Sequence, residues 1–323
     1  MEPEIVPARQ PEMDVLGLGA VAVDDILYLD HFPEADSKMP IQRGERRAGG
    51  NAGTALVAAR RMGHSCDYAG SLDDRDDLSR FIISAFETEG VSTRHLALRP
   101  GTRPVHSTIL MDTLGRTRTI LFDIRAAVGA DPELPPEEVI RSTRVLLVDH
   151  IGIVGMTRAA RLARRAGIPV VADLEREEDA LFPELQALSD HLILPYDFAR
   201  GITGGKGPAE ILRALWRADR AAVVITRGAE GSWYLTAEEP GTVYFQPAFH
   251  VAAVDTNGCG DIFHGVYAAG LCEGLGAAER IRFASAVSAL KAMRPGGQAA
   301  IPLRAASERF LRERSPEAPR VIV

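Results

Sequence analysis

Residues 145–174 read VLLVDHIGIVGMTRAARLARRAGIPVVADL, and this stretch predicts the class of the fold. The aliphatic runs at 145–149 and 169–174 are typical of buried strands, and residues 156–166 between them are typical of a helix. Apolar strands that alternate with helices form parallel sheets with helices on both faces. The stretch therefore predicts an α/β fold.

The same alternation extends from this stretch in both directions. Further strands are predicted at 14–19, 191–195 and 221–226. Further helices are predicted at 52–62, 77–89, 181–188, 208–217, 261–273, 277–293 and 305–313. A mostly parallel central sheet is the architecture that this order of elements favours.

Two stretches, at about 25–48 and 103–125, do not follow the alternation because they contain strand patterns without a helix between them. Within the second stretch, residues 106–112 and 117–123 are typical of a hairpin around a turn at 113–116. We therefore expect a small separate β-sheet that could act as a lid.

Composition excludes several classes of protein. The chain has 323 residues, 46% of them hydrophobic and 25% charged, which is typical of a globular protein with a substantial core. Its 37 Lys and Arg against 44 Asp and Glu give a net charge of −7, which argues against a nucleic-acid partner. Three cysteines without a CxxC pair favour a cytoplasmic protein, and the absence of a long apolar run argues against a membrane partner.

The strongest chemical signal is the stretch Asp-Thr-Asn-Gly-Cys-Gly-Asp at 255–261, directly before an apolar helix. The backbone N–H groups of Gly258, Cys259 and Gly260 would meet the positive end of the helix dipole, which makes the loop an anion site. Asp261 would face the same anion, where a carboxylate could take a proton from an attacking alcohol. The alternative is an ordinary helix start capped by an Asp.

Two further glycine-rich loops could bind a ligand. Residues 47–54, Arg-Ala-Gly-Gly-Asn-Ala-Gly-Thr, enter the helix at 52–62, and the amide of Asn51 could hold a hydroxyl group. The alternative is a plain loop with Asn51 as the helix cap. Residues 226–231, Thr-Arg-Gly-Ala-Glu-Gly, follow an apolar strand, where open α/β sheets bind ligands. The alternative there is a hairpin turn.

Two other glycine patterns do not satisfy the motifs that they approach. Residues 17–22 match a loose dinucleotide fingerprint, but residues 24–29 read as a strand where a helix should follow. Residues 204–207 approach a phosphate loop, but Arg200 and Gly207 stand where glycine and Ser or Thr are required.

These three loops, in this order, resemble the ribokinase-like (PfkB) family of carbohydrate kinases over about residues 14–312. Shorter stretches are similar to ketohexokinase and sulfofructose kinase. The resemblance implies a three-layer α/β/α sandwich with a mostly parallel central sheet and a small β-sheet lid. It implies one kinase domain at 13–315, between a disordered tail at 1–12 and a C-terminal tail at 316–323. It further implies transfer of the γ-phosphoryl group of ATP, with Mg²⁺, to a primary hydroxyl of a ketose or related sugar.

The resemblance also implies roles for individual residues. Asp261 would be the general base, and the N–H groups of Gly258, Cys259 and Gly260 would stabilise charge on the phosphoryl oxygens. The residues implied to bind the sugar are Asp24, Asp36, Lys38, Gly49, Gly50, Asn51, Thr54 and Asp261. The residues implied to bind the nucleotide are Thr226, Gly228, Gly231, Asn257, Gly258 and Gly260. A monovalent cation would lie near Asp255.

The chain departs from the family pattern at residues 196–199, Tyr-Asp-Phe-Ala, where many members carry Asn-x-x-Glu. Asp197 is the substitute available there for ordering Mg²⁺. Cys259 replaces an alanine of the signature, and a thiol at a helix N-terminus tends toward a lowered pKa, so we consider it as a reactive thiol. The alternative is a small buried residue.

Two other functions on the same fold stay open. A nucleoside kinase would need an aromatic platform, which Tyr28, Phe32 and Phe122 could supply. A non-catalytic sugar-sensing relative would keep sugar binding and lose transfer. The exposed edges of a lid sheet also favour a homodimer through the lid.

Overall fold

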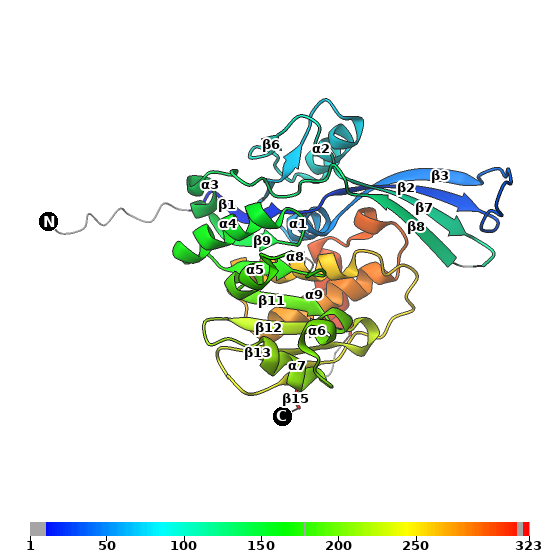
Figure 1. Cartoon of the computed structure of the whole chain (residues 1–323). Helices are drawn as coiled ribbons and strands as arrows, with labels where there is room; N and C mark the ends of the chain where they lie inside the picture. The colour runs from blue at the N-terminus through cyan, green and yellow to red at the C-terminus, as the bar shows by residue number, and fades with distance from the viewer. Residues whose placement is uncertain (1–10, 116, 178, 315–318, 323) are drawn as a thin grey trace.

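The computed structural model describes residues 11–322 except 116, 178 and 315–318 (Figure 1). The expected tail at 1–12 therefore falls mostly outside the described residues. Part of the expected C-terminal tail is ordered, because Arg320–Val321 form strand β15 and pair with β14 (Tyr244–Gln246).

The core of the molecule is a nine-stranded sheet with the order β15-β14-β13-β12-β11-β10-β9-β1-β4. Neighbouring strands from β4 to β12 are parallel, and β13 to β15 are antiparallel. The remaining bounds are β1 Met13–Leu18, β4 Cys66–Tyr68, β9 Thr143–Val148, β10 Val170–Asp173, β11 His191–Pro195, β12 Ala222–Thr226 and β13 Ser232–Thr236. The predicted mostly parallel sheet is confirmed.

Helices cover both faces of this sheet because its strands are apolar on both faces. Alternate residues such as Val15 and Leu16, or Leu147 and Leu146, belong to different buried clusters on the two faces. One face is covered by α1 (Asn51–Arg61), α2 (Asp77–Glu89), α8 (Cys259–Cys272) and α9 (Ala277–Ala292), with α10 (Arg304–Glu313) outside α9. The other is covered by α3 (Glu137–Arg141), α4 (Ile153–Arg165), α5 (Phe182–Leu188), α6 (Tyr196–Thr203) and α7 (Pro208–Leu215).

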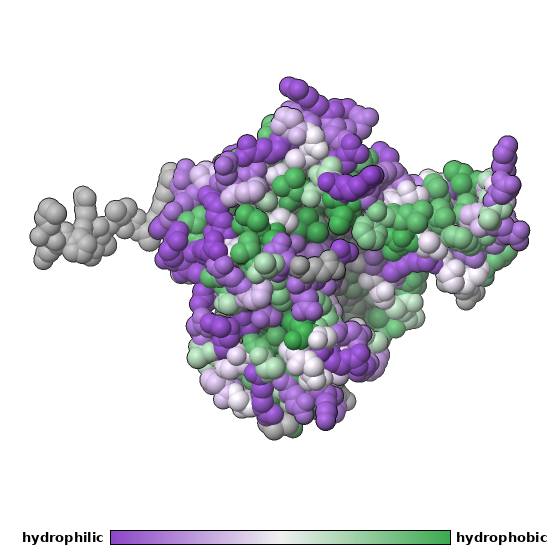
Figure 2. All heavy atoms as spheres, in the orientation of Figure 1, coloured by the Kyte–Doolittle hydropathy of each residue, from purple (hydrophilic) through white to green (hydrophobic). Residues whose placement is uncertain are grey.

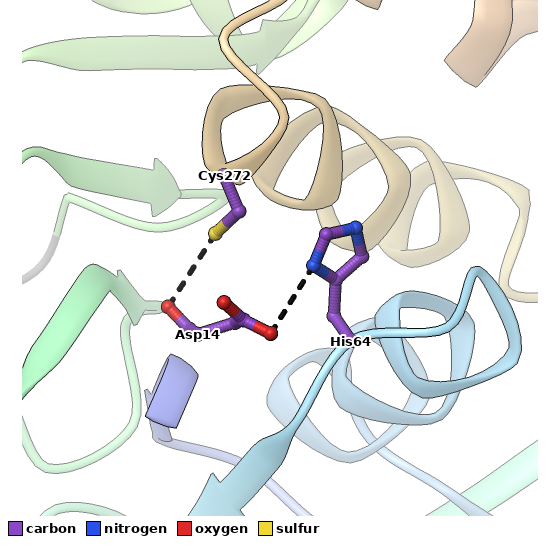
Figure 3. Close-up of side chains that lie close together, drawn as sticks. All are labelled: Asp14, His64 and Cys272. Carbon is purple, nitrogen blue, oxygen red and sulfur yellow. Dashed lines mark hydrogen bonds and ion pairs between the residues drawn. The ribbon is translucent and has the colours of Figure 1, made fainter. Parts of the chain in front are cut away.

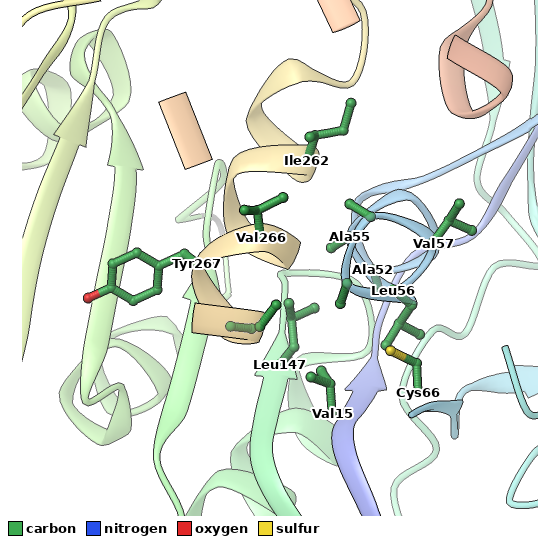
Figure 4. Close-up of a cluster of buried hydrophobic side chains, with 14 of the residues drawn as sticks. Val15, Ala52, Ala55, Leu56, Val57, Cys66, Leu147, Ile262, Val266 and Tyr267 are labelled. Carbon is green, nitrogen blue, oxygen red and sulfur yellow. The ribbon is translucent and has the colours of Figure 1, made fainter. Parts of the chain in front are cut away.

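Helices α1 and α8 lie side by side on the sheet, as Figure 4 shows for Ala55, Leu56, Ile262 and Val266. Their approach is close enough that a Cβ on Gly265 would fall 2.0 Å from the backbone oxygen of Ala55. Only glycine fits at this contact. The packing places the N-terminal ends of the two helices, where two of the predicted ligand loops lie, at the same edge of the sheet.

A separate four-stranded sheet projects from the body of the molecule (Figure 1). Its order is β3 (Arg43–Gly49), β2 (Ala22–Leu29), β7 (Val105–Asp112) and β8 (Thr117–Asp123), and β7 and β8 form the predicted hairpin. We call it the small sheet. Strand β2 also confirms that no helix follows the loose dinucleotide pattern. Two short strands, β5 (Ser71–Leu72) and β6 (Ala97–Leu98), pair elsewhere.

None of the helices in the described part of the chain is long and apolar enough to cross a membrane.

Candidate active site

Two cavities meet at the loop formed by residues 255–261. The first, of about 360 Å³, lies between this loop, the start of α1 and the small sheet, and the second, of about 380 Å³, lies between the loop and the connection from β12 to β13. Thr256, Cys259 and Gly260 line both cavities. The site therefore offers two compartments that share one wall.

The shared wall is an open helix start rather than an Asp-capped one. Gly258 is the N-cap of α8, with φ of 74°, and Asp261 lies in the first helical turn. The alternative of a helix capped by an Asp side chain is therefore wrong. The first turn of a helix leaves N–H groups without intrahelical acceptors, which suits an anion. One of these groups is already used, because the N–H of Cys259 donates to the carbonyl of Thr256 at 3.2 Å.

Asp261 has the electrostatic surroundings of a base. Burial raises the pKa of this carboxyl well above its usual range, and the neighbouring carboxyl groups of Asp173, Glu175 and Asp149 raise it further. A carboxylate with higher proton affinity takes a proton from an alcohol more readily than an ordinary one. Asp261 lines the first cavity.

The first cavity also contains most of the residues predicted to bind a sugar. Asp24, Gly49, Gly50, Asn51 and Thr54 all line it. Burial raises the pKa of Asp24 despite a hydrogen bond from Ser107 and the nearby charge of Arg47. The hydroxyl of Thr54 accepts a 3.2 Å hydrogen bond from Gln298.

The glycine pair before α1 is required by its backbone. Gly50 has φ of 88°, and a Cβ there would fall 2.5 Å from the Cα of Val21. Gly50, not Asn51, is the N-cap, so the alternative of Asn51 as a cap is wrong. The side-chain amide of Asn51 instead donates to Asp173 at 3.2 Å.

The second cavity is lined by the loop at 226–231. Thr226, Gly228 and Gly231 contribute to its wall, as predicted for a nucleotide site. The loop is also a hairpin connection, since β12 and β13 pair antiparallel on either side of it, so the two interpretations are compatible. Apolar side chains complete the wall, and these surroundings suit a flat aromatic base; they include Phe249, Val251, Phe263, Ala289 and Ala292.

Several predicted residues lie elsewhere. Asp36 and Lys38 are exposed in the connection between β2 and β3 and line neither cavity. Asp197 lies in the first turn of α6 with 80% of its side chain exposed, pairs with Arg200 at 3.5 Å, and lines neither cavity. Asn257 and Gly258, predicted to bind the nucleotide, line the first cavity.

The aromatic residues considered for a nucleobase platform do not form one in this structure. The hydroxyl of Tyr28 donates a hydrogen bond to Glu45, and the guanidinium of Arg43 lies over the Tyr28 ring. The side chains of Phe32 and Phe122 are about half exposed. None of Tyr28, Phe32 and Phe122 lines either cavity.

The structure adds functional candidates that our sequence reasoning missed. Arg47, Glu175 and Gln298 line the first cavity. Asp149 and Asp173, buried at the carboxyl ends of β9 and β10, place their carboxyl groups near Asp261. Polar residues at the ends of apolar strands are the signal that could have found the two aspartates.

A family model described as pfkB family carbohydrate kinase matches residues 14–304. The chain belongs to this family. Relatives include a ribokinase of Haemophilus influenzae, 26% identical over 91% of this chain and 97% of the relative. An ATP-dependent ribose-1-phosphate kinase of Halopiger xanaduensis is 28% identical over 93% of this chain and 98% of the relative. The crystal structure of a putative ribokinase from Agrobacterium tumefaciens superposes with a TM-score of 0.84, at 28% identity over 93% of this chain and 98% of that one.

As a pfkB carbohydrate kinase, this chain is a phosphotransferase with a sugar acceptor. The Mg²⁺ that the family resemblance implies prefers oxygen ligands, many of which phosphates and water would supply. The carboxylates of Asp261 and Glu175 line the same cavity beside the anion loop, so the donor set at this place fits the ion. Asp197, lining neither cavity, is not part of that set.

Cys259 of this kinase does not have the electrostatics of a reactive thiol. Burial raises its pKa, and the charge of Lys291 offsets this only in part. Its Sγ lies 3.6 Å from the carbonyl oxygen of Ser288. The premise of a lowered pKa is therefore wrong, because the thiol points into α9 rather than toward the anion.

Asp255 already has a cationic neighbour. Its carboxylate accepts hydrogen bonds from the N–H groups of Asn257 at 2.9 Å and Gly296 at 3.1 Å, and the ammonium of Lys291 lies 3.5 Å away. Burial raises the pKa of Asp255, but these partners outweigh that effect and lower it. The place predicted for a monovalent cation thus holds an ammonium group of the chain itself.

A second polar cluster, of Asp14, His64 and Cys272, lies away from both cavities, where β1 begins and α8 ends (Figure 3). Ligand atoms of the three residues lie within 4.8 Å of one another. However, the Asp14 carboxylate already accepts hydrogen bonds from Arg144 and Ser65. Burial also raises the pKa of Cys272 to about 12. These contacts describe an ion-pair cluster that joins β1, β9 and α8.

Proposed function

We propose that this kinase transfers the γ-phosphoryl group of ATP to a primary hydroxyl of a ketose or related sugar, with Asp261 as the general base. The observation that carries the proposal is that two cavities share the anion loop while Asp261 lies in one of them. An in-line transfer needs a base in the cavity that holds the acceptor and backbone N–H donors between the two cavities.

In the first cavity, Asp24, Gly50 and Asn51 hold hydroxyl groups of the sugar and direct its primary hydroxyl at Asp261. Asp261 accepts the hydroxyl proton while the oxygen forms a bond to the γ-phosphorus and the bond to the leaving ADP oxygen breaks. The N–H groups of Gly258 and Gly260 face the charge on the transferred group. The N–H of Cys259 contributes less than predicted, because it already donates to Thr256.

In the second cavity, Thr226, Gly228 and Gly231 hold the ATP phosphates and ribose, and the apolar wall takes the base. A Mg²⁺ ion bound at this place would neutralise charge on the phosphates. Glu175 would hold the ion, directly or through water, because this carboxylate lines the same cavity as Asp261. Loss of hydration and the charge of Asp173 raise the pKa of Glu175.

We propose two roles for the small sheet. It closes over the sugar as a lid, because Asp24, Ile26 and Arg118 extend from its strands into the first cavity. Closure would exclude water and limit hydrolysis of ATP. It also forms a homodimer contact, because hydrophobic residues gather on this projection (Figure 2), among them the exposed Ile120, Leu121 and Phe122 on β8.

The test is an ADP-release assay with Mg·ATP against a panel of acceptors. The panel contains fructose, ribose, tagatose, 2-keto-3-deoxygluconate, fructose 6-phosphate, sulfofructose and adenosine, and Asp261→Asn is the control. We expect a strong signal with one sugar, reduced at least about 100-fold in the variant, the low end of a general base's usual contribution. A signal with adenosine alone would replace the proposal with a nucleoside kinase. Tight sugar binding without any ADP release would replace it with a non-catalytic relative.

A further inference from the structure

Lys291 is one of only three lysines in the sequence, and its side chain is 0% exposed. It lies in the last turn of α9, under the anion loop. Its Nζ donates to the carbonyl oxygens of Asp255, at 3.0 Å, and Asn257, and lies 3.5 Å from the Asp255 carboxylate. A lysine is rarely fully buried unless it is paired. Here the partners of the buried ammonium are three oxygens of one loop.

We propose that Lys291 is a built-in cation that shapes the anion loop, so that nucleotide binding by this kinase needs no monovalent metal ion. The inference rests on the proposed function, since it concerns the loop that receives the phosphates. Lys291 is a positioning residue, because it contacts the loop and not a substrate.

The geometry of the peptide bond explains how an ammonium below the loop acts above it. In a trans peptide, the carbonyl and the following N–H point in opposite directions. Lys291 holds the carbonyl of Asn257, so the N–H of Gly258 points away from Lys291. Removing the ammonium would free this peptide to rotate, because Gly258 has no side chain to restrict it.

A second contact from the same helix acts in the same way. The hydroxyl of Ser288, three residues before Lys291 and thus on the same face of α9, donates to the carbonyl of Cys259 at 3.0 Å. The N–H of Gly260 therefore points away from Ser288. The next carbonyl oxygen, that of Gly260, lies 2.8 Å from Nδ1 of His264. Helix α9 thus orients the two donors that the proposed transfer uses.

The same contacts exclude a metal ion from this place. A monovalent cation near Asp255 would need carbonyl and carboxylate oxygens, and the ammonium already occupies them. Two positive charges sharing these oxygens would repel one another strongly inside the protein, where screening by water is weak. The charges of Lys291 and Asp255 are opposite, so the net charge of the pair is zero without an added ion.

The first measurement uses the wild-type chain alone. Binding of Mg·ATP is measured by calorimetry in KCl, NaCl and tetramethylammonium chloride at equal ionic strength. We expect dissociation constants within about twofold of one another. A constant that is ten times lower in KCl than in tetramethylammonium chloride would overturn the inference.

The second measurement uses variants. Lys291→Met removes the charge but keeps the apolar stem, and Lys291→Ala leaves space for an ion, while Lys206→Met changes an exposed lysine as the matched control. In tetramethylammonium chloride we expect at least tenfold weaker ATP binding by both Lys291 variants and unchanged binding by the control. Added K⁺ or NH₄⁺ should restore binding in Lys291→Ala only, which a purely structural role would not produce.

The outcomes separate this inference from the proposed function. Binding by Lys291→Met equal to that of the wild type overturns the inference, as does the absence of rescue in a folded Lys291→Ala. If neither variant folds, the wild-type salt comparison decides. A wild type that binds ATP in every salt but phosphorylates no sugar overturns the proposed function and leaves the role of Lys291 intact.

Discussion

The side-chain amide of Asn51 donates a 3.2 Å hydrogen bond to the carboxylate of Asp173, a residue 122 positions further along the chain. The contact joins the start of α1 to the carboxyl end of β10, beside Asp261. It places the amide of Asn51 in the first cavity and fixes its orientation. The sugar-binding role proposed for Asn51 therefore depends on a partner that belongs to the acidic group around the base.

Asn51→Ala is expected to raise the KM for the sugar about tenfold, because one hydrogen bond to a substrate hydroxyl is worth about 1 kcal/mol or slightly more. The KM for ATP should change less than about threefold, since Asn51 does not line the second cavity. Steady-state kinetics with each substrate varied in turn measure both constants. An unchanged KM for the sugar would remove Asn51 from its binding site.

Gly231→Ala is expected to weaken ATP binding and lower the melting temperature. Gly231 has φ of 111°, and a Cβ there would fall 2.4 Å from the backbone oxygen of Gln246, so the loop must shift. Gly207→Ala is the matched control, because Gly207 has φ of −159°, open space around its Cβ position, and no place in either cavity wall. Calorimetric ATP binding and thermal melting of the two variants should separate them, and equal behaviour would contradict the steric argument.

The raised pKa of Asp261 predicts how activity depends on pH. A base must be ionised, so kcat should fall as the pH falls through this pKa, at values well above those of an ordinary aspartate. The profile of kcat against pH between 4 and 9 tests this prediction. An acid limb below pH 4.5 would indicate that the surrounding carboxylates do not act on the base.

Asp149 predicts how stability depends on pH. Burial raises its pKa to about 8, against 3.8 for an ordinary aspartate. Between about pH 4 and pH 8 the folded state holds a proton that the unfolded state has released, so this group lowers stability as the pH rises, by up to about 1.4 kcal/mol per pH unit, with no further change above pH 8.

Asp149→Asn should remove this contribution, because an amide does not titrate. Urea unfolding at pH 5, 6, 7 and 8 gives the free energy of unfolding for both proteins. We expect the advantage of the variant over the wild type to grow with pH across this range. Parallel curves would mean that Asp149 does not stay protonated in the fold.

Iodoacetamide at pH 7.5 is expected to leave most of the activity intact over an hour without ATP, because burial raises the pKa of Cys259 and the thiol faces Ser288. Cys259→Ala should retain activity within about threefold. Mass spectrometry identifies which cysteine reacts. Rapid inactivation with carbamidomethylation at Cys259 would restore the reactive-thiol hypothesis.

The sequence by itself determined the class of the fold, because strand and helix periodicity and the turn-forming glycines are local properties. It also identified the three ligand loops, including the one at 255–261, since exposing backbone N–H groups requires glycine at particular positions. Asn51 and Asp261 were found in this way, whereas Asp24 was implied by the family resemblance, and all three line one cavity.

Only the tertiary structure decided which distant groups share the site. Three of these groups contact or influence residues that lie 34 to 122 positions away in the chain, namely Asp149, Asp173 and Lys291. No local sequence pattern encodes such a distance. The close contact of Gly265 with Ala55 brings the ends of α1 and α8 together, and the acidic ends of β9 and β10 lie near the base that these helices frame. For the same reason Asp36, Lys38 and Asp197, plausible by their residue type, lie outside both cavities, and a buried ammonium stands where a metal ion was expected.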